Sequence, residues 1–407
     1  MTTGVHIIGA AMSRFGKRPQ DSVKTLTAQV VAEVLQDAGI GAEALDAAWF
    51  SNTRQQMLEG QNTIRGQIAL RAAGVHGLPV TNVENACASG STGVWGAMAA
   101  IRAGMADVAL VVGAEKMVFP DRPDQVAAAF AGGTDVHDRA GVIDYIRSIG
   151  GEDPGPGRSL FMDLYAAQAR RHMAQYGTTQ ADFARVAAKN HTHGSQNCRA
   201  QYRTPFSLDQ VLADKPIVDP FTRAMCAPVS DGAAALVLCS DAALARLGAA
   251  RSVRLRACAL VSTTPRDAAA FDQHIGRRAA QQAYEAAGLG PEDIDLAEVH
   301  DATAYAEIQQ VENLGLAAPG GAVARLAAGD FTLGGRVPVN PSGGLLAKGH
   351  PVGATGLAQL FELTTQLRGE AGPRQVSGAR IGVAENGGGF LGVEEGATAV
   401  TILEGQA

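Results

Sequence analysis

The stretch Asn82-Val-Glu-Asn-Ala-Cys87-Ala-Ser-Gly-Ser-Thr-Gly93 joins a short extended run to an Ala-rich segment with helical periodicity at Ser91–Ala103. It places a cysteine at or just before a helix N-terminus. Free backbone N–H groups and the positive end of the helix dipole favour a thiolate there, so we expect a lowered pKa for Cys87 and a reactive sulfur. From these residues alone, a buried and inert cysteine in a strand-to-helix turn is the alternative.

A second Gly-rich segment lies near the C-terminus and reads Asn340-Pro-Ser-Gly-Gly-Leu-Leu-Ala-Lys-Gly-His350-Pro-Val-Gly-Ala-Thr-Gly356. It holds a histidine in a turn that precedes another helix. A histidine in such a place can take a proton from a thiol and can donate to a thioester oxygen, which are two tasks of nucleophilic acyl transfer. Before the two segments are combined, a loop histidine without a role is an equally good interpretation.

Apolar strand-like runs alternate with Ala-rich helical segments along the whole chain, which is typical of an α/β protein. Buried strands are predicted at Val5–Ile8, Val108–Val112, Ala234–Leu238, Val253–Ala259, Leu296–Val299, Ile381–Glu385 and Ala397–Leu403. Helices are predicted at Val23–Ala38, Ser91–Ala103, Leu160–Tyr176, Gln180–His193, Arg277–Ala287, Ala304–Leu314 and Thr355–Leu367.

Two parts of the chain resemble each other weakly. A helix that ends in glycine, an acidic turn and a strand occur at Val31–Phe50 and again at Ala279–Val299. Shared helix C-caps can produce this echo by chance, so it is weak support for duplicated halves. Between Phe119 and Pro216 the character changes to Pro, Gly and charged residues, followed by two helical stretches. We interpret this segment as an insertion that covers a binding cleft.

Composition excludes several classes of protein. The chain has 407 residues with 34 basic and 40 acidic side chains, a net charge of −6, and neither sign forms a long block. Nucleic acid is therefore not an expected partner. The five cysteines form no CxxC pair or zinc-type group, so we expect neither a disulfide framework nor a metal site. Without a signal-like N-terminus or a long apolar run, we expect a cytoplasmic protein that does not contact a membrane.

Taken together, the Cys87 segment, the Gly-His-Pro-Val-Gly-Ala-Thr-Gly turn at 349–356 and the glycines 387–389 resemble the thiolase pattern, in the family's order. The segment from Cys226 to Leu238 resembles the strand that closes the first half of these enzymes. The resemblance implies an α/β thiolase fold, in which two similar βαβαβαββ halves form a five-layered αβαβα core with an inserted loop domain. The implied domains are 1–118 with 217–250 for the N-terminal half, 119–216 for the loop domain, and 251–407 for the C-terminal half.

Where most thiolases carry Asn-Glu-Ala-Phe, this chain has His300-Asp-Ala-Thr303, which resembles sterol-carrier-protein-type thiolases and their bacterial relatives. By that resemblance, His300 and His350 direct donors at the thioester oxygen of acyl-CoA. The backbone N–H groups of Cys87 and Gly387 hold the acyl-enzyme oxygen, which gives two oxyanion holes. A histidine that caps a strand end is the alternative for His300. The family needs no metal or redox cofactor, and coenzyme A is its co-substrate.

One departure from the family concerns its second cysteine. Ordinary thiolases have it two residues before the glycine that matches Gly387, where this sequence has Glu385. Sterol-carrier-type enzymes take a cysteine from the position after His-Asp, but Ala302 stands there. We hypothesise that Glu385 is the acid or base of the carbon chemistry, because burial raises the pKa of a carboxyl group into a useful range. The alternative is a strand-end carboxylate bonded to nearby backbone.

The resemblance implies a thiolase of the acetyl-CoA acyltransferase type, which cleaves or forms a 3-oxoacyl-CoA by Claisen chemistry through a Cys87 acyl-enzyme. A thiolase-like acyl-CoA aldolase or lyase and a non-catalytic acyl-CoA or lipid-binding protein are the alternatives. Bacterial relatives act on steroid and aromatic substrates, benzoylsuccinyl-CoA among them. We therefore expect a substrate with a bulky acyl group. Substrate choice is expected to lie in Met117–Asp163.

Contacts with coenzyme A and with partner proteins are further expectations. Arg223 and Ser230 are the predicted CoA-binding residues. The helix that follows Cys87 and the strand at Val108–Val112 resemble elements that pair across the family's dimer interface, so a homodimer is expected. Some relatives associate with a small zinc-containing OB-fold protein, and such a partner is expected here too.

Overall fold

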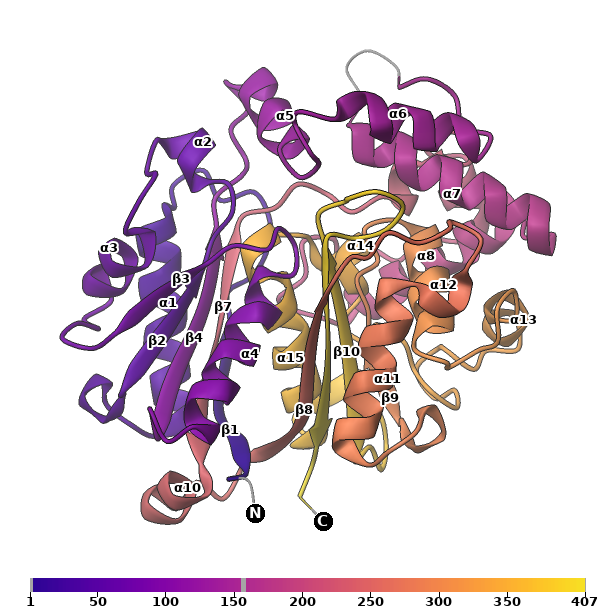
Figure 1. Cartoon of the computed structure of the whole chain (residues 1–407). Helices are drawn as coiled ribbons and strands as arrows, with labels where there is room; N and C mark the ends of the chain where they lie inside the picture. The colour runs from indigo at the N-terminus through magenta and orange to yellow at the C-terminus, as the bar shows by residue number, and fades with distance from the viewer. Residues whose placement is uncertain (1–2, 155–158, 407) are drawn as a thin grey trace.

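Nine strands form one twisted sheet in the computed structural model, which describes residues 3–154 and 159–406 (Figure 1). Their order across the sheet is β3-β2-β4-β7-β1-β8-β11-β10-β9. The strands are β1 (Val5–Met12), β2 (Ala47–Ser51), β3 (Val80–Val83), β4 (Val108–Glu115), β7 (Gly232–Ser240), β8 (Val253–Ser262), β9 (Leu296–Glu298), β10 (Ile381–Gly388) and β11 (Ala397–Glu404). A separate small hairpin contains β5 (Pro216–Val218) and β6 (Phe221–Thr222).

The sheet consists of two halves with a similar internal pattern, with five strands in the N-terminal half and four in the C-terminal half. In the N-terminal half, β3, β2 and β4 run parallel, and β7 and β1 follow antiparallel. In the C-terminal half, β9 and β10 run parallel, and β11 and β8 follow antiparallel. The halves join through β1 and β8, which pair at only two positions, His6 with Arg254 and Ile7 with Val253. The weak sequence echo therefore marks equivalent elements of two similar halves.

Most segments that connect the strands contain helices. None of the described helices is long and apolar enough to cross a lipid bilayer. All seven predicted helices are present, with ends that differ by at most a few residues. The helices are α1 (Val23–Ala38), α2 (Gln55–Glu59), α3 (Arg65–Ala72), α4 (Ser89–Arg102), α5 (Pro123–Ala131), α6 (Arg139–Ser148), α7 (Leu160–Tyr176), α8 (Gln180–Ser195), α9 (Leu208–Leu212), α10 (Asp241–Leu247), α11 (Ile275–Ala287), α12 (Ala304–Asn313), α13 (Ala322–Ala327), α14 (Gly344–Lys348) and α15 (Thr355–Leu367).

The helices and the two halves of the sheet form five layers. Helices α4 and α15 contact strands of both halves and each other, so they form the middle layer (Figure 1). Helix α1 covers the outer face of the N-terminal half, with α3 beside it, and α11 covers the outer face of the C-terminal half. Because each half has apolar side chains on both faces, helices must cover both sides of it. The predicted αβαβα arrangement is confirmed.

Five helices, α5 to α9, lie between β4 and the small hairpin, in the segment that the sequence marks as an insertion. Figure 1 shows α5, α6 and α7 above one end of the central strands. Helices α7 and α8 share a hydrophobic core with the C-terminal half, where Phe183 of α8 packs edge-on against Tyr305 of α12. The limits of the three predicted domains stay a prediction.

The sheet order corrects one expectation about the dimer. Strand β4 lies between β2 and β7 and pairs with both, so it has no free edge for a second chain. Our prediction that Val108–Val112 pairs across an interface is therefore wrong. Strand β3 is the outermost strand of this half, and its Thr81 and Asn82 are exposed.

Close packing at Gly113 on β4 gives a test of the fold. A Cβ atom there would lie 2.2 Å from the backbone oxygen of Gly353 and 2.8 Å from the Cα of Ala354. Since backbone cannot move aside cheaply, Gly113→Ala should lower the free energy of unfolding by about 1–3 kcal/mol in urea denaturation. Gly132→Ala is the control, because its Cβ would meet nothing nearer than 4.0 Å. Equal stability of both variants would contradict this packing.

Candidate active site

A tight turn between β3 and α4 holds Cys87. Ala86 has a φ of 48°, in the left-handed region that L-residues rarely adopt. The Ser89 hydroxyl stabilises this turn, because it accepts from the Asn85 N–H at 2.8 Å and donates to the Ala86 carbonyl at 2.6 Å. Helix α4 begins at Ser89, so the sulfur lies directly before a helix N-terminus, as the sequence predicts.

His350 lies in the Gly-rich turn before α15, and its ring is held by one hydroxyl group. Its Nδ1 lies 2.7 Å from the Thr355 Oγ1. That hydroxyl donates its only proton to the Pro351 carbonyl at 3.1 Å, so it must accept a hydrogen bond from Nδ1–H. This assignment leaves Nε2 of His350 without a proton and able to act as a base.

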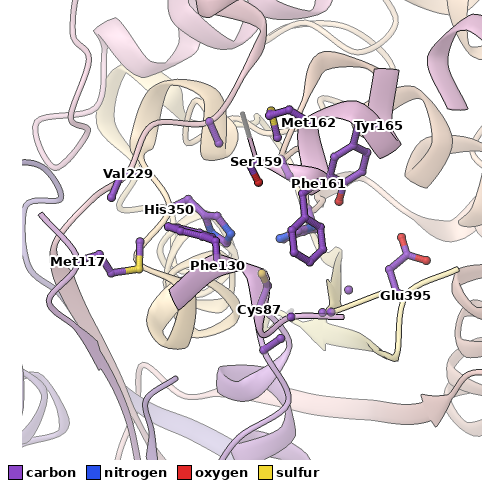
Figure 2. A pocket seen from close by; sticks show the side chains of 18 of the residues that line it. Cys87, Met117, Phe130, Ser159, Phe161, Met162, Tyr165, Val229, His350 and Glu395 are labelled. Atoms are coloured by element: carbon purple, nitrogen blue, oxygen red, sulfur yellow. The ribbon is translucent and has the colours of Figure 1, made fainter. Parts of the chain in front are cut away.

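The structure brings Cys87, His300 and His350 together. The sulfur and one ring nitrogen of each histidine all lie within 4.8 Å of one another. The two imidazole rings have centroids 5.1 Å apart and planes inclined by 72°. Nε2 of His300 is buried and has no hydrogen-bond partner among the described residues. Figure 2 shows Cys87 beneath His350 at the floor of a cavity.

Burial keeps all three groups uncharged at neutral pH. It raises the pKa of Cys87 to about 11, although Arg54 and the Gly389 backbone N–H act in the opposite direction. Our expectation of a lowered pKa is wrong, because the loss of hydration outweighs the favourable helix terminus. Burial also lowers the pKa of His300 to about 4 and that of His350 well below 6.5, the latter helped by His300 and Arg54. The resting site therefore contains a thiol beside neutral imidazoles.

A buried carboxylate, Glu115 at the end of β4, fixes the His350 turn against the N-terminal half. It accepts from the Gly353 N–H at 2.8 Å and from the backbone N–H of Arg54 at 2.8 Å. Asn52 and Thr53 donate to the same carboxylate. One carboxylate thus joins the turn that bears His350 to the loop between β2 and α2.

The His300-Asp301 pair divides two tasks. Asp301 accepts from the Leu345 N–H at 2.6 Å, at the start of α14, and from the Asn190 side chain at 2.8 Å. It therefore ties the strand end to α14 and to α8 of the inserted segment, while His300 lines the cavity.

Glu385 lies behind His300. Its Oε2 accepts from the His300 N–H at 3.1 Å, and its Oε1 has no partner. Burial and the neighbouring Glu395 raise the pKa of Glu385 well above its usual value. Glu385 is not among the residues that line the cavity, but its Oε1 would lie 3.3 Å from a Cβ added at Gly387, which does line it.

The glycines 387–389 line the cavity beside the nucleophile. A Cβ at Gly388 would lie 2.9 Å from the Cys87 nitrogen and 2.3 Å from the Asn85 oxygen, so only glycine permits this approach of β10 to the cysteine turn. The backbone N–H of Gly389 is close enough to the sulfur to lower its pKa by hydrogen bonding. The backbone N–H of Gly387 is the predicted oxyanion donor, and the backbone N–H of Gly389 is a second donor beside it.

The cavity has a volume of about 230 Å³, and most of its wall is apolar. Side chains from the inserted segment form much of this wall (Figure 2), and the choice of substrate by Met117–Asp163 stays a prediction. The apolar wall residues include Met117, Phe130, Phe161, Met162, Tyr165 and Val229. Two charged residues that our sequence reasoning missed, Arg54 and Glu395, also line it. Neither belongs to a motif, and only their position after β2 and before β11 would have suggested them.

The two predicted CoA contacts lie elsewhere. Arg223 is exposed and pairs with Asp214 at 2.7 Å. Ser230 is buried, accepts from the His350 N–H at 3.0 Å and donates to Gln201 at 2.6 Å, so its hydroxyl holds the His350 turn. Neither side chain lines the cavity, and CoA binding by these two residues stays a prediction.

Cys87, His300 and His350 form the one group of metal-type ligands among the described residues. Sulfur and imidazole donors suit Zn²⁺. They equally suit a nucleophile with its proton acceptor.

Two family models cover almost the whole chain: "Thiolase, N-terminal domain" matches residues 5–242, and "Thiolase C-terminal domain-like" matches residues 263–404. The chain belongs to the thiolase family. This thiolase is 37% identical over 393 residues to an acetyl-CoA acetyltransferase of Methanothermobacter thermautotrophicus, covering 95% of this chain and 97% of that protein. It is 34% identical to human sterol carrier protein 2, covering 98% of this chain and 72% of that one.

Two further relatives extend the comparison. The thiolase is 31% identical to the benzoylsuccinyl-CoA thiolase subunit BbsB of Thauera aromatica, with 91% of each chain covered. A solved structure titled "Ltp2-ChsH2(DUF35) aldolase" has the same fold, with a TM-score of 0.78, 23% identity, and coverage of 99% of this chain and 98% of that one. The family and the relatives support an acyltransferase.

The raised pKa of the thiol can be measured directly. Because thiolate is the reactive form, the rate at which iodoacetamide alkylates Cys87 should rise about tenfold per pH unit from pH 7 to 9, without a plateau. Peptide mass mapping follows the label, and Cys87→Ser identifies the background. A rate that is already constant below pH 8 would mean that the sulfur is ionised at rest.

Proposed function

We propose that this thiolase catalyses CoA-dependent cleavage of a 3-oxoacyl-CoA, or the reverse Claisen condensation, through an acyl-enzyme on Cys87. The observation that carries the proposal is the sulfur within 4.8 Å of two imidazoles, of which His350 has its Nε2 free. A thiol with a pKa of about 11 needs a base at the moment of attack, and this arrangement supplies one.

In the first step, Nε2 of His350 takes the Cys87 proton and the sulfur attacks the C3 carbonyl of the substrate. The C2–C3 bond breaks, and its electron pair stays on C2 of the departing thioester as an enolate. The unpartnered Nε2 of His300 donates to the oxygen on which this charge develops. Protonation of C2 releases the shortened acyl-CoA, and the remaining acyl group is bound to Cys87.

In the second step, the thiol of free CoA loses a proton and attacks the acyl carbonyl. Cys87 leaves as a thiolate and regains its proton from His350. The backbone N–H groups of Cys87, Gly387 and Gly389 are the donors for the oxygen of this intermediate. The sum is one 3-oxoacyl-CoA and one CoA converted into two acyl-CoA molecules.

Glu385 supplies the proton to C2 in this proposal and takes the proton of the CoA thiol in the second step. Three observations support the assignment: its pKa is raised well above the usual value, its Oε1 is unpaired, and that oxygen lies beside Gly387 at the cavity wall. A carboxyl group with a raised pKa can donate a proton first and then accept one.

We also propose two binding partners for the chain, a second protein and a second copy of itself. The structural relative's title joins two components, and BbsB is named as a subunit. We therefore retain the small zinc-containing OB-fold protein as a proposed partner. A homodimer is proposed through the free edge of β3, which presents unpaired backbone groups.

Glu385→Gln separates the two kinds of chemistry. Mass spectrometry after incubation with acetyl-CoA should still find an acyl adduct on Cys87, while CoA-dependent cleavage of 3-oxoacyl-CoA falls about 100-fold or more. Cys87→Ser is the control without an adduct. Unchanged turnover in Glu385→Gln removes Glu385 from the mechanism, and failure of the wild type to form any adduct would favour a lyase or a binding protein.

The role of Thr355 as a positioning residue gives another test. Thr355→Val removes the acceptor that fixes Nδ1–H of His350, so acylation of Cys87 in single-turnover experiments should slow by roughly 10- to 100-fold. Thr355→Ser keeps the hydroxyl and should restore most of the rate. If the valine and serine variants behave alike, the hydroxyl does not set the tautomer.

A further inference from the structure

Arg54 is a buried cation in the wall of the catalytic cavity. Only 8% of it is exposed, and it lines the cavity with Cys87, Met117 and Phe130. Its charge acts on the sulfur and on the imidazole, since it lowers the pKa of both Cys87 and His350. Arg54 is thus close to the place where the acyl group is transferred.

The guanidinium is only partly satisfied. Its Nη1 donates to the Ala129 carbonyl, its carbon lies 5.1 Å from the centre of the Phe130 ring, and its Nε is buried without a partner. Throughout the described residues, no carboxylate forms an ion pair with it. Glu115, which contacts the backbone of Arg54, is occupied by donors from Asn52, Thr53, Arg54 N and Gly353.

The other charged residue of the cavity lies on the opposite side of Cys87. Figure 2 shows Phe130 and Met117 on one side of the sulfur, and Tyr165 and Glu395 on the other. Glu395 accepts from Gln310 at 3.0 Å. The cavity is therefore cationic at the Phe130 side and anionic at the far side, and apolar between.

A buried, unpaired guanidinium is costly unless a ligand compensates its charge. The fork of N–H donors on arginine fits a carboxylate. The phosphates of CoA cannot be the ligand in this position, because the pantetheine arm separates them from the thioester that reacts at Cys87. Two anions remain, the sulfur of Cys87 when it ionises and a charge on the acyl group itself, and only the second can select between substrates.

Resting on the proposed function, we propose that Arg54 selects 3-oxoacyl-CoA substrates whose acyl part carries its own carboxylate. The carboxylate binds at the Phe130 side of the cavity, and the apolar wall takes the rest of the acyl group. An uncharged acyl group of equal length leaves the guanidinium unpaired and is bound less well.

The test compares two substrates of equal chain length, 3-oxoadipyl-CoA, which ends in a carboxylate, and 3-oxohexanoyl-CoA, which ends in a methyl group. The wild type should have the higher kcat/KM for 3-oxoadipyl-CoA. Arg54→Met should lower kcat/KM for 3-oxoadipyl-CoA by roughly 10- to 100-fold more than it lowers kcat/KM for 3-oxohexanoyl-CoA. Arg54→Lys should recover part of the loss.

Arg122→Met is the matched control. Arg122 also stacks on an aromatic ring, that of Phe119 at 4.2 Å, and also donates to a backbone carbonyl, that of Leu58, but it does not line the cavity. It should leave the substrate preference unchanged.

Two results would overturn the inference and leave the proposed function intact. One is a preference of the wild type for 3-oxohexanoyl-CoA. This measurement does not depend on whether any variant folds. The other is an equal loss for both substrates in Arg54→Met, since Arg54 then acts on the sulfur and not on the acyl group. Absence of any Cys87 adduct with any acyl-CoA would instead remove the proposed function itself.

Discussion

Glu115 provides the contact on which the site depends. The nucleophile comes from the N-terminal half and the proposed base from the C-terminal half, and these halves pair at only two positions of the sheet. Beside the packing of the middle helices, the buried carboxylate joins them at the site itself, between the loop after β2 and the turn at Gly353. Because it is surrounded by donors and shielded from water, small displacements of either half would leave buried polar groups unsatisfied.

Neutrality is the second property of the site. The thiol of Cys87 and both imidazoles are uncharged at neutral pH for the same reason, which is loss of hydration, and the same loss raises the pKa of Glu385. Charge on the sulfur and on the imidazoles then arises only when substrate is bound, in a cavity whose wall also holds Arg54 and Glu395. A site of this kind needs no ionised cysteine at rest.

The sequence predicted the two-half α/β core and the meeting of Cys87 with His350 through its resemblance to the thiolase pattern. The order of strand, turn and helix in each Gly-rich segment predicted only where each residue lies relative to its own helix. It did not predict the raised pKa of Cys87, since depth of burial is a property of the whole fold. It also missed Arg54 and Glu395, which reach the cavity from loops without a pattern. Glu385 was recognised by its place in the motif, but only the structure shows that it lies behind His300 and does not line the cavity. The assignment of β4 to an interface failed because sequence does not give strand order.

The two helices of the middle layer determine where Cys87 and His350 lie. Helices α4 and α15 are equivalent elements of the two halves, each followed by a strand of its own half, β4 and β10. Cys87 precedes the first of these helices and His350 precedes the second. Two identical copies of either half would therefore offer a pair of sulfurs or a pair of imidazoles at this place, never one of each. The difference in sequence between the two halves is what lets a sulfur and an imidazole face each other within one chain.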